Sequence, residues 1–181
     1  WAQLFNDIDG ADYPHLYVVG RTFSEESKQL VREKGLEAVV RFLGEVSNRR
    51  LSLLYSGARA VVIPSRAEGF GLPALEGMSC GIPVVSTPLP SVKEFGEGTV
   101  WFSADFEPES FARSVRRALG EVSREPLRIE RGKRKAEEFT IRKQARETWA
   151  VYQSLFPAEL REKEPQNTVH SSAAASPRVS P

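Results

Sequence analysis

Short apolar runs rich in β-branched residues alternate along the chain with segments that carry apolar residues at helical spacing. The runs are four or five residues long, and most are closed by Gly, Pro or a polar residue, which predicts buried strands. The predicted strands cover residues 16–20, 39–43, 60–63, 83–86 and 99–102. The predicted helices cover residues 24–34, 48–57, 72–80, 92–95 (a single turn) and 108–119. Ser24 is the expected N-cap of the first of these helices.

The predicted strands are apolar almost without interruption. A strand with one face in water would alternate apolar and polar residues instead. Continuously apolar strands that are separated by helices indicate a parallel sheet with helices on both faces. The sequence therefore predicts an α/β protein with a doubly wound, Rossmann-like parallel sheet.

A different pattern follows over residues 124–156, which have helical spacing and are basic in their first half. Glu residues are interleaved with the Lys and Arg residues, so the favoured interpretation is a solvated helix face with intrahelical ion pairs. The alternative is a patch for anionic lipid or phosphate that makes peripheral membrane contact. From residue 159 onward the chain is polar and rich in Ser, Ala and Pro. We therefore expect one domain over residues 1–156, ending in a long helix, and a disordered polar tail over 157–181.

Composition and charge narrow the class of protein. The 181 residues include 25 Lys and Arg against 24 Asp and Glu, and this balance does not point to a nucleic-acid partner. Hydrophobic residues make up 40% of the chain, which excludes wholesale disorder, and no apolar run approaches the roughly 18 residues of a membrane span. Cys80 is the only cysteine, which excludes an internal disulfide and fits a reducing, cytoplasmic compartment. Because the chain opens with Trp1, we expect a piece of a longer protein.

The most informative stretch is residues 61–87, which predict a strand, a Gly-containing loop, a helix and a second strand. Open parallel sheets bind their ligands in the crevice outside the carboxyl ends of the strands. We expect the N–H groups of Gly71, Leu72 and Ala74 to point into that crevice at the positive end of the helix dipole. Gly69 and Gly71 would let a ligand approach the backbone closely. The stretch thus predicts a cradle for sugar hydroxyls or a phosphate.

Two carboxylates flank this cradle, Glu68 on the loop and Glu76 in the helix, with seven residues between them. Taken separately, Glu76 is best interpreted as a first-turn acid that the helix dipole stabilises by about 0.3–1 kcal/mol. Glu68 alone is best interpreted as an exposed loop acid. Taken together, the pair suits a ligand with both hydroxyls and phosphates, because carboxylates accept hydroxyl hydrogen bonds while amides bind the negative charge.

The string EGFGLPALE, residues 68–76, closely resembles the E-x7-E signature of retaining glycosyltransferases with the GT-B fold, of the family 4 type. The resemblance includes the PS before this string and the CGIPVVST after it. It extends to LYVVG, VVRFLGEV and LLYSGARAVVIPS, and it covers residues 16–119.

The resemblance implies the C-terminal, donor-binding domain of an enzyme that transfers sugar from a nucleotide-diphosphate sugar with retention of anomeric configuration. It gives Glu68 the catalytic position, in contact with hydroxyls of the transferred sugar, and it places Glu76 on the ribose hydroxyls. The other donor-binding residues that it implies are Val46, beside the base, and Gly69, Phe70, Gly71 and Leu72, against sugar and phosphate. It implies no metal and no cofactor, and an acceptor bound by an N-terminal domain that this chain lacks.

The sequence departs from the family pattern in two places. The family supplies an Arg and a Lys for the diphosphate from a G-R-x-x-x-x-K-G-like segment before the LYVVG strand, and nothing in residues 1–15 matches it. Residues 1–6 resemble the end of the helix that follows that segment. Pro90 and Ser91 replace the Gly-Gly that the family has before the acid matched by Glu94. We therefore expect weak donor binding and no transfer by this chain alone. The alternative function is a non-catalytic nucleotide-sugar-binding module or pseudoenzyme subunit.

Other candidate residues give weaker indications. The D-x-D formed by residues 7–9 would be a metal-binding motif in another glycosyltransferase fold, but a polar loop is the favoured interpretation. His15 and His170 have no acid or cysteine nearby in the sequence, so they indicate no catalytic triad. Cys80 is interpreted as a packing residue rather than a nucleophile.

Overall fold

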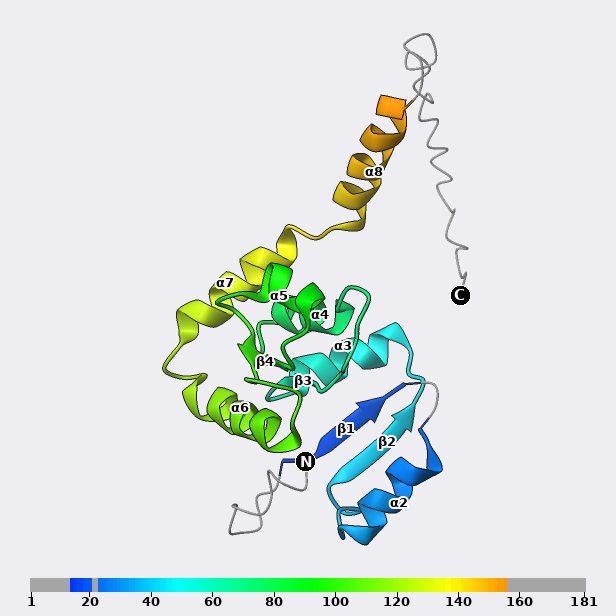
Figure 1. Ribbon diagram of the computed structural model, residues 1–181, viewed down its shortest axis with the longest axis vertical. Coiled ribbons are helices and arrows are strands. Elements are labelled where there is room, and N and C mark those ends of the chain that lie inside the picture. Colours follow the sequence, from blue (N-terminus) through cyan, green and yellow to red (C-terminus); the bar gives the residue numbers. More distant parts are fainter. Residues whose placement is uncertain (1–13, 21–22, 156–181) are drawn as a thin grey trace, which may run out of the picture. The chain divides into compact units, whose positions relative to one another are not determined.

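The computed structural model describes residues 14–20 and 23–155, in which strands and helices alternate (Figure 1). The strands are β1 (Leu16–Val19), β2 (Val40–Gly44), β3 (Val61–Ile63), β4 (Val84–Ser86) and β5 (Trp101–Phe102). The helices are α2 (Glu25–Glu33), α3 (Asn48–Gly57), α4 (Leu72–Ser79), α5 (Pro90–Gly96), α6 (Pro108–Glu121), α7 (Pro126–Glu137) and α8 (Ile141–Leu155). Predictions for residues 1–6, 7–9 and 157–181, and for His170, lie outside the described part of the chain.

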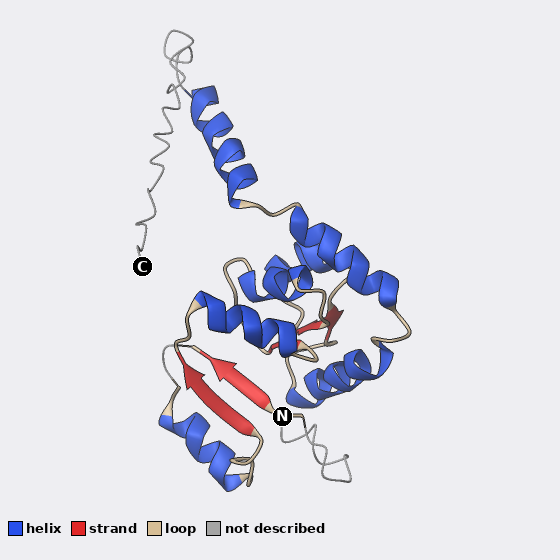
Figure 2. Cartoon of the chain, turned by 180° about the vertical axis from the view of Figure 1, so that it is seen from behind, coloured by secondary structure: helices blue, strands red, loops and turns tan. Residues whose placement is uncertain are grey.

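Every strand pairing among the described residues is parallel, as the apolar strands predicted. β1 pairs with β2, with Leu16 opposite Val40, and the two strands run side by side in one direction in Figure 2. β3, β4 and β5 form a second sheet in that order. The doubly wound, Rossmann-like α/β architecture is therefore confirmed, with the described strands arranged as a two-stranded and a three-stranded sheet.

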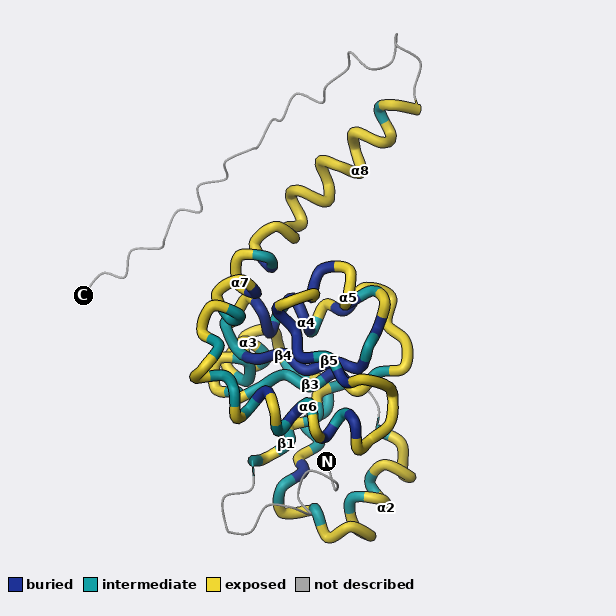
Figure 3. The backbone as a smooth tube through the Cα atoms, turned by 60° about the vertical axis from the view of Figure 1, so that its left-hand side comes forward, coloured by how far each residue is buried: buried dark blue, intermediate teal, exposed yellow. Residues whose placement is uncertain are grey.

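The hydrophobic core lies on both faces of the three-stranded sheet. Val84 and Val85 are neighbours in β4, are at most 1% exposed, and belong to different core clusters, because successive side chains of a strand point to opposite faces. One cluster joins Val84 to apolar residues of α4, α5 and α7, and the other joins Val85 to Trp101 and α6. Figure 3 shows the buried residues gathered on these elements.

β1 is covered less completely than its sequence predicted. Its side chains alternate between half-buried and exposed, and Tyr17 and Val19 are 51% and 39% exposed. These two residues lie on the same side of the strand because side-chain direction repeats every second residue. The described residues therefore leave one side of this apolar strand partly exposed.

The basic segment forms two helices instead of the single long helix that was expected. Thr140 interrupts it, because its Oγ1 accepts the N–H of Lys143 at 3.1 Å and so caps α8. The chain also divides between Phe139 and Thr140 into two compact units, so α7 belongs to the first and α8 to the second. The predicted intrahelical ion pairs are present, with Arg134 3.8 Å from Glu130 in α7. No helix in the described ranges is long and apolar enough to cross a membrane.

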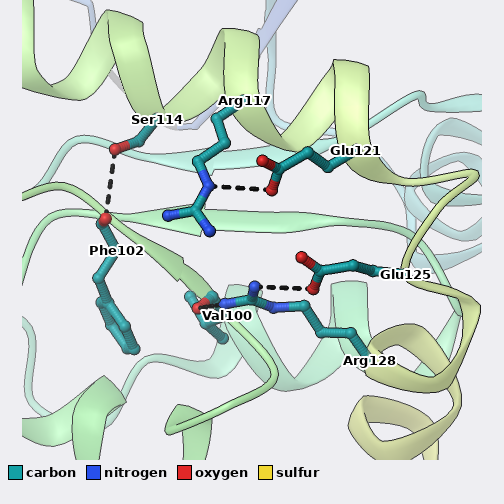
Figure 4. A network of polar contacts seen from close by, with 7 residues as sticks. All are labelled: Val100, Phe102, Ser114, Arg117, Glu121, Glu125 and Arg128. Carbon is teal, nitrogen blue, oxygen red and sulfur yellow. Dashed lines mark hydrogen bonds and ion pairs between the residues drawn. The ribbon is translucent and has the colours of Figure 1, made fainter.

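A polar network fastens α6 and α7 to β5 and the residue before it (Figure 4). Arg128 of α7 donates to the Val100 carbonyl at 3.0 Å and to Glu125 at 3.0 Å. Its guanidinium also lies 4.1 Å from the ring centroid of Trp101. In α6, the Ser114 hydroxyl donates to the Phe102 carbonyl at 3.2 Å. These bonds join α6 and α7 to β5 and to the residue that precedes it.

Candidate functional site

Two loops meet at the carboxyl ends of β3 and β4, which are adjacent parallel strands. The first loop leaves β3 after Ile63 and enters α4 at Leu72, and the second leaves β4 after Ser86 and enters α5 at Pro90. Glu68 lies on the first loop and Glu76 lies in α4. The structure thus places both carboxylates on the predicted elements, with Glu68 at the edge where open parallel sheets bind ligands. Glu76, however, lies beyond the first turn of α4, so its interpretation as a first-turn acid is wrong.

Gly71 makes the tight entry into α4 and adopts a left-handed conformation with φ +96°. A Cβ at this position would lie 2.6 Å from Cγ2 of Val92 in α5, so the backbone approaches α5 as closely as only glycine permits. The predicted exposure of the Ala74 N–H is wrong, because this group donates to the Gly71 carbonyl at 2.9 Å. The first turn of α4 therefore closes on itself, and the open N-terminal donors are those of Gly71 and Leu72 by helix geometry.

Two hydroxyl groups bond Glu68 directly, and a third bonds the loop that carries it. Ser65 on the same loop donates its hydroxyl to Glu68 Oε1 at 2.7 Å, and Ser91 of α5 donates to the Glu68 backbone carbonyl at 3.2 Å. Thr87, just after β4, donates to the Ser65 carbonyl. These bonds tie the loop after β3 to the segment after β4. Sequence reasoning quoted Ser65 and Thr87 only within strings that resemble the family and gave them no role, and it noted Ser91 only as a departure from the family pattern.

Glu76 is joined to α3 by a short hydrogen bond. The hydroxyl of Tyr55, 21 residues earlier in the chain, donates to Glu76 Oε2 at 2.6 Å. Burial, followed by this hydrogen bond and the charge of Glu76, raises the pKa of Tyr55 well above its usual value. The phenol therefore keeps its proton, and remains a donor, throughout the neutral pH range. Sequence reasoning gave Tyr55 no role beyond its place in the helix predicted over residues 48–57.

Phe70 is 45% exposed, and its ring packs against two other aromatic rings. Its ring centroid lies 5.7 Å from that of Phe95 in α5 and 5.9 Å from that of Phe139 just after α7. Phe95 and Phe139 are themselves 5.5 Å apart, so the three rings form one cluster. The loop that carries Glu68 is therefore anchored by an aromatic contact as well as by hydroxyls, whereas the side chain of Leu72 is 60% exposed.

The remaining predicted residues lie apart from these contacts. Val46 is half-buried in the turn between β2 and α3, the helix that carries Tyr55. Glu94 lines a polar cleft of about 380 Å³ between α5 and α7, together with Arg131 and Lys135. Cys80 is exposed at the end of α4, so its interpretation as a packing residue is wrong. The described part of the chain contains no group of three or more His, Cys, Asp or Glu residues that could hold a metal ion.

Comparison with known proteins identifies the family. The family model described as glycosyl transferases group 1 matches residues 3–136. This chain belongs to that family. One curated relative of this glycosyl transferase group 1 chain is the O-antigen chain mannosyltransferase B of Escherichia coli. The two sequences are 33% identical over 127 residues, which cover 70% of this chain and 33% of that protein. The chain spans about a third of the length of the curated relatives it matches.

Solved structures of the same fold are also similar. Sucrose-phosphate synthase from Thermosynechococcus elongatus superposes with a TM-score of 0.70 at 26% identity, over 78% of this chain and 38% of that one. Anabaena HepE in complex with UDP-glucose superposes with a TM-score of 0.66 at 25% identity, over 76% of this chain and 41% of that one. The fold of this glycosyl transferase group 1 domain is accordingly one half of a GT-B architecture.

Proposed function

We propose that this domain binds the nucleotide-diphosphate sugar donor of a retaining glycosyltransferase and supports transfer of the sugar to an acceptor. The observation that carries the proposal is the arrangement of Glu68 and Glu76 around the entry of α4. Each carboxylate has its own hydroxyl donor, Ser65 at 2.7 Å and Tyr55 at 2.6 Å, and Gly71, which lies between them in the sequence, is the N-cap of α4. Such a site offers fixed acceptors for hydroxyls next to amides for a phosphate.

The proposed roles follow the chemistry of each group. Glu68 is the catalytic residue that contacts hydroxyls of the transferred sugar and positions it. Glu76 binds the ribose hydroxyls, the backbone from Gly69 to Leu72 lies against sugar and phosphate, and Val46 flanks the base. The complex of Anabaena HepE with UDP-glucose supports a nucleotide sugar as the class of donor.

In the proposed reaction the bond between the anomeric carbon and the phosphate oxygen breaks, and the nucleoside diphosphate leaves with the bonding electrons. The acceptor oxygen attacks the same face of the sugar, and its proton passes to the leaving phosphate, so configuration is retained. Positive charge develops on the sugar ring and negative charge on the diphosphate, and stabilising the latter is the main electrostatic task. Glu68 therefore positions and stabilises, and no covalent intermediate on it is required.

Three further features of the proposed function concern cofactors, the acceptor and the cellular compartment. We propose that transfer needs no metal or cofactor, that the acceptor is bound by a separate N-terminal domain, and that the protein works in the cytoplasm. The single cysteine supports a reducing compartment. This chain matches only about a third of the length of its curated relatives, which supports a division of donor and acceptor binding between two domains.

Calorimetric titration of the chain with UDP-glucose, GDP-mannose and ADP-glucose, and with UDP, GDP and ADP, tests these roles. Glu68→Gln should reduce the affinity for the preferred nucleotide sugar toward that for its free nucleotide. Glu76→Gln should weaken both about tenfold, corresponding to about 1.4 kcal/mol. Glu37→Gln, at an exposed acid in the turn before β2, is the control and should change neither. Equal effects of Glu68→Gln and Glu76→Gln on sugar and nucleotide would contradict the assigned roles, and absence of binding would favour a silent module.

A further inference from the structure

The contact between Tyr55 and Glu76 links α3 to the candidate site. The phenol oxygen lies 2.6 Å from Glu76 Oε2, within the range of hydrogen bonds from a hydroxyl to an ionised carboxylate. Bonds of this kind are about twice as strong as those between neutral groups. The two side chains come from different helices, so the bond fixes the carboxylate relative to the fold and not merely within α4.

The hydrogen bond from Tyr55 distinguishes the two carboxylate oxygens of Glu76. A carboxylate has about four lone-pair positions, two on each oxygen. The phenol occupies Oε2 from α3. A glutamate on a helix surface otherwise samples several rotamers, and fixing it on ligand binding costs entropy. With Oε2 held, Oε1 is presented in one direction, and that entropy is already spent before a ligand arrives.

We propose that Tyr55 is a positioning residue that presents Glu76 Oε1 to the vicinal hydroxyls of the nucleotide ribose, and so makes the site select ribonucleotides over 2′-deoxyribonucleotides. The inference rests on the proposed function of Glu76 and deepens it. A mobile carboxylate can adjust its position to either sugar, whereas a fixed carboxylate binds tightly only the ligand whose hydroxyls match its direction.

The phenol is suited to this role in two ways. Tyr55 is half-buried, which shields the bond from water, and its ring is rigid, with only two side-chain torsions. Its proton stays in place at neutral pH because burial, the bond to Glu76 and the charge of Glu76 all raise its pKa. The hydroxyl therefore acts as a donor to Glu76 throughout the physiological pH range.

A double-mutant cycle with Tyr55→Phe and Glu76→Ala tests the role. The probes are UDP, GDP and ADP with their 2′-deoxy counterparts, and dissociation constants come from amide shift titrations. In the wild-type background, Tyr55→Phe should weaken ribonucleotide binding about fivefold and deoxyribonucleotide binding less than twofold. In the Glu76→Ala background it should have no further effect. Tyr17→Phe, at a tyrosine that is 51% exposed, is the control for loss of a hydroxyl.

Equal losses for ribo and deoxy probes, or the same loss in the Glu76→Ala background, would overturn the inference and make Tyr55 a packing residue. Thermal unfolding of each variant separates such losses from a general loss of folding. A ligand-free measurement distinguishes this failure from failure of the proposed function. With ring-labelled tyrosine, Glu76→Gln should lower the pKa of Tyr55. That result together with no nucleotide binding by the wild type would reject the proposed function, and the positioning role with it, while leaving the contact intact. An unchanged Tyr55 titration would refute the contact itself.

Discussion

Ser91 Oγ donates a hydrogen bond of 3.2 Å to the backbone carbonyl of Glu68. The bond joins the first turn of α5 to the loop that carries the proposed catalytic carboxylate. Ser91 stands in the position for which the family resemblance of the sequence implies glycine, which has no side chain to make this bond. The departure from the family pattern therefore adds a tether to the loop.

Loss of this tether should loosen the loop without unfolding the domain. A neutral hydrogen bond of this kind contributes about 0.5–1.5 kcal/mol, so Ser91→Ala should weaken donor binding about threefold and speed amide exchange over residues 65–71. Hydrogen exchange followed by NMR and a donor titration measure the two effects. Ser56→Ala, which removes a hydroxyl that bonds only within α3, is the matched control. Unchanged exchange in the loop of Ser91→Ala would show that the tether does not restrain it.

Gly71→Ala should destabilise the domain. The added Cβ would lie 2.6 Å from Cγ2 of Val92, and the φ of +96° is one that alanine rarely adopts. Overpacking costs about 1–3 kcal/mol and an unfavourable backbone conformation costs a similar amount, so we expect a loss of roughly 2–5 kcal/mol in the free energy of unfolding. Urea denaturation measures it. Gly69→Ala has no neighbour within 4 Å and should change stability by less than about 1 kcal/mol. Similar losses in both variants would contradict the close approach to Val92.

Arg128→Ala should cost more than Arg117→Ala. Arg128 has a side chain only 16% exposed, bonds the Val100 carbonyl and lies over Trp101, whereas Arg117 is 60% exposed and pairs with Glu121 alone in Figure 4. We expect about 2–3 kcal/mol for Arg128→Ala and less than about 1 kcal/mol for Arg117→Ala, by urea denaturation. The reverse order would show that the network does not fasten α7 to β5.

The raised pKa of Tyr55 should make the free energy of unfolding fall at alkaline pH. Its pKa is raised in the fold, first by burial and then by the bond and charge of Glu76, with Cys80 adding to the shift. The folded state therefore holds the phenolic proton more tightly than the unfolded chain, in which tyrosine titrates near about pH 10. The stabilisation is complete below that pH and is lost as the pH rises above it. The free energy of unfolding, measured from about pH 8 to 11, should fall less steeply in Tyr55→Phe than in wild type or Tyr17→Phe. Identical slopes would contradict the shift.

The fold was predictable from the sequence because β4, the central strand of the three-stranded sheet, is buried on both faces, and this leaves a continuous apolar run. Val84 and Val85 show the reason, since they enter different core clusters from adjacent positions. The break between α7 and α8 was missed, although Thr140 is a residue type that commonly caps the start of a helix.

The hydrogen bonds of the site were not predictable in the same way. Glu68 and Glu76 were identified from one short string, but their partners come from elsewhere in the chain. Tyr55 is 21 residues from Glu76, and Ser91 is 23 residues from Glu68. Neither spacing follows a helical or strand period, because each contact depends on how α3 and α5 pack against α4 and its loop. The N–H of Ala74 was misassigned for a local reason, since a short bond to Gly71 closes the first turn.

The proposed function requires that residues 65–76 bind a nucleotide sugar, and amide shift mapping tests this requirement most directly. The chain would be titrated with UDP-glucose, GDP-mannose and ADP-glucose, with Glu76→Ala as the comparison. We predict that one nucleotide series shifts the amides from Gly69 to Glu76 and that the shifts weaken in the variant. Shifts confined to other parts of the chain, or the same shifts in Glu76→Ala, would contradict the account.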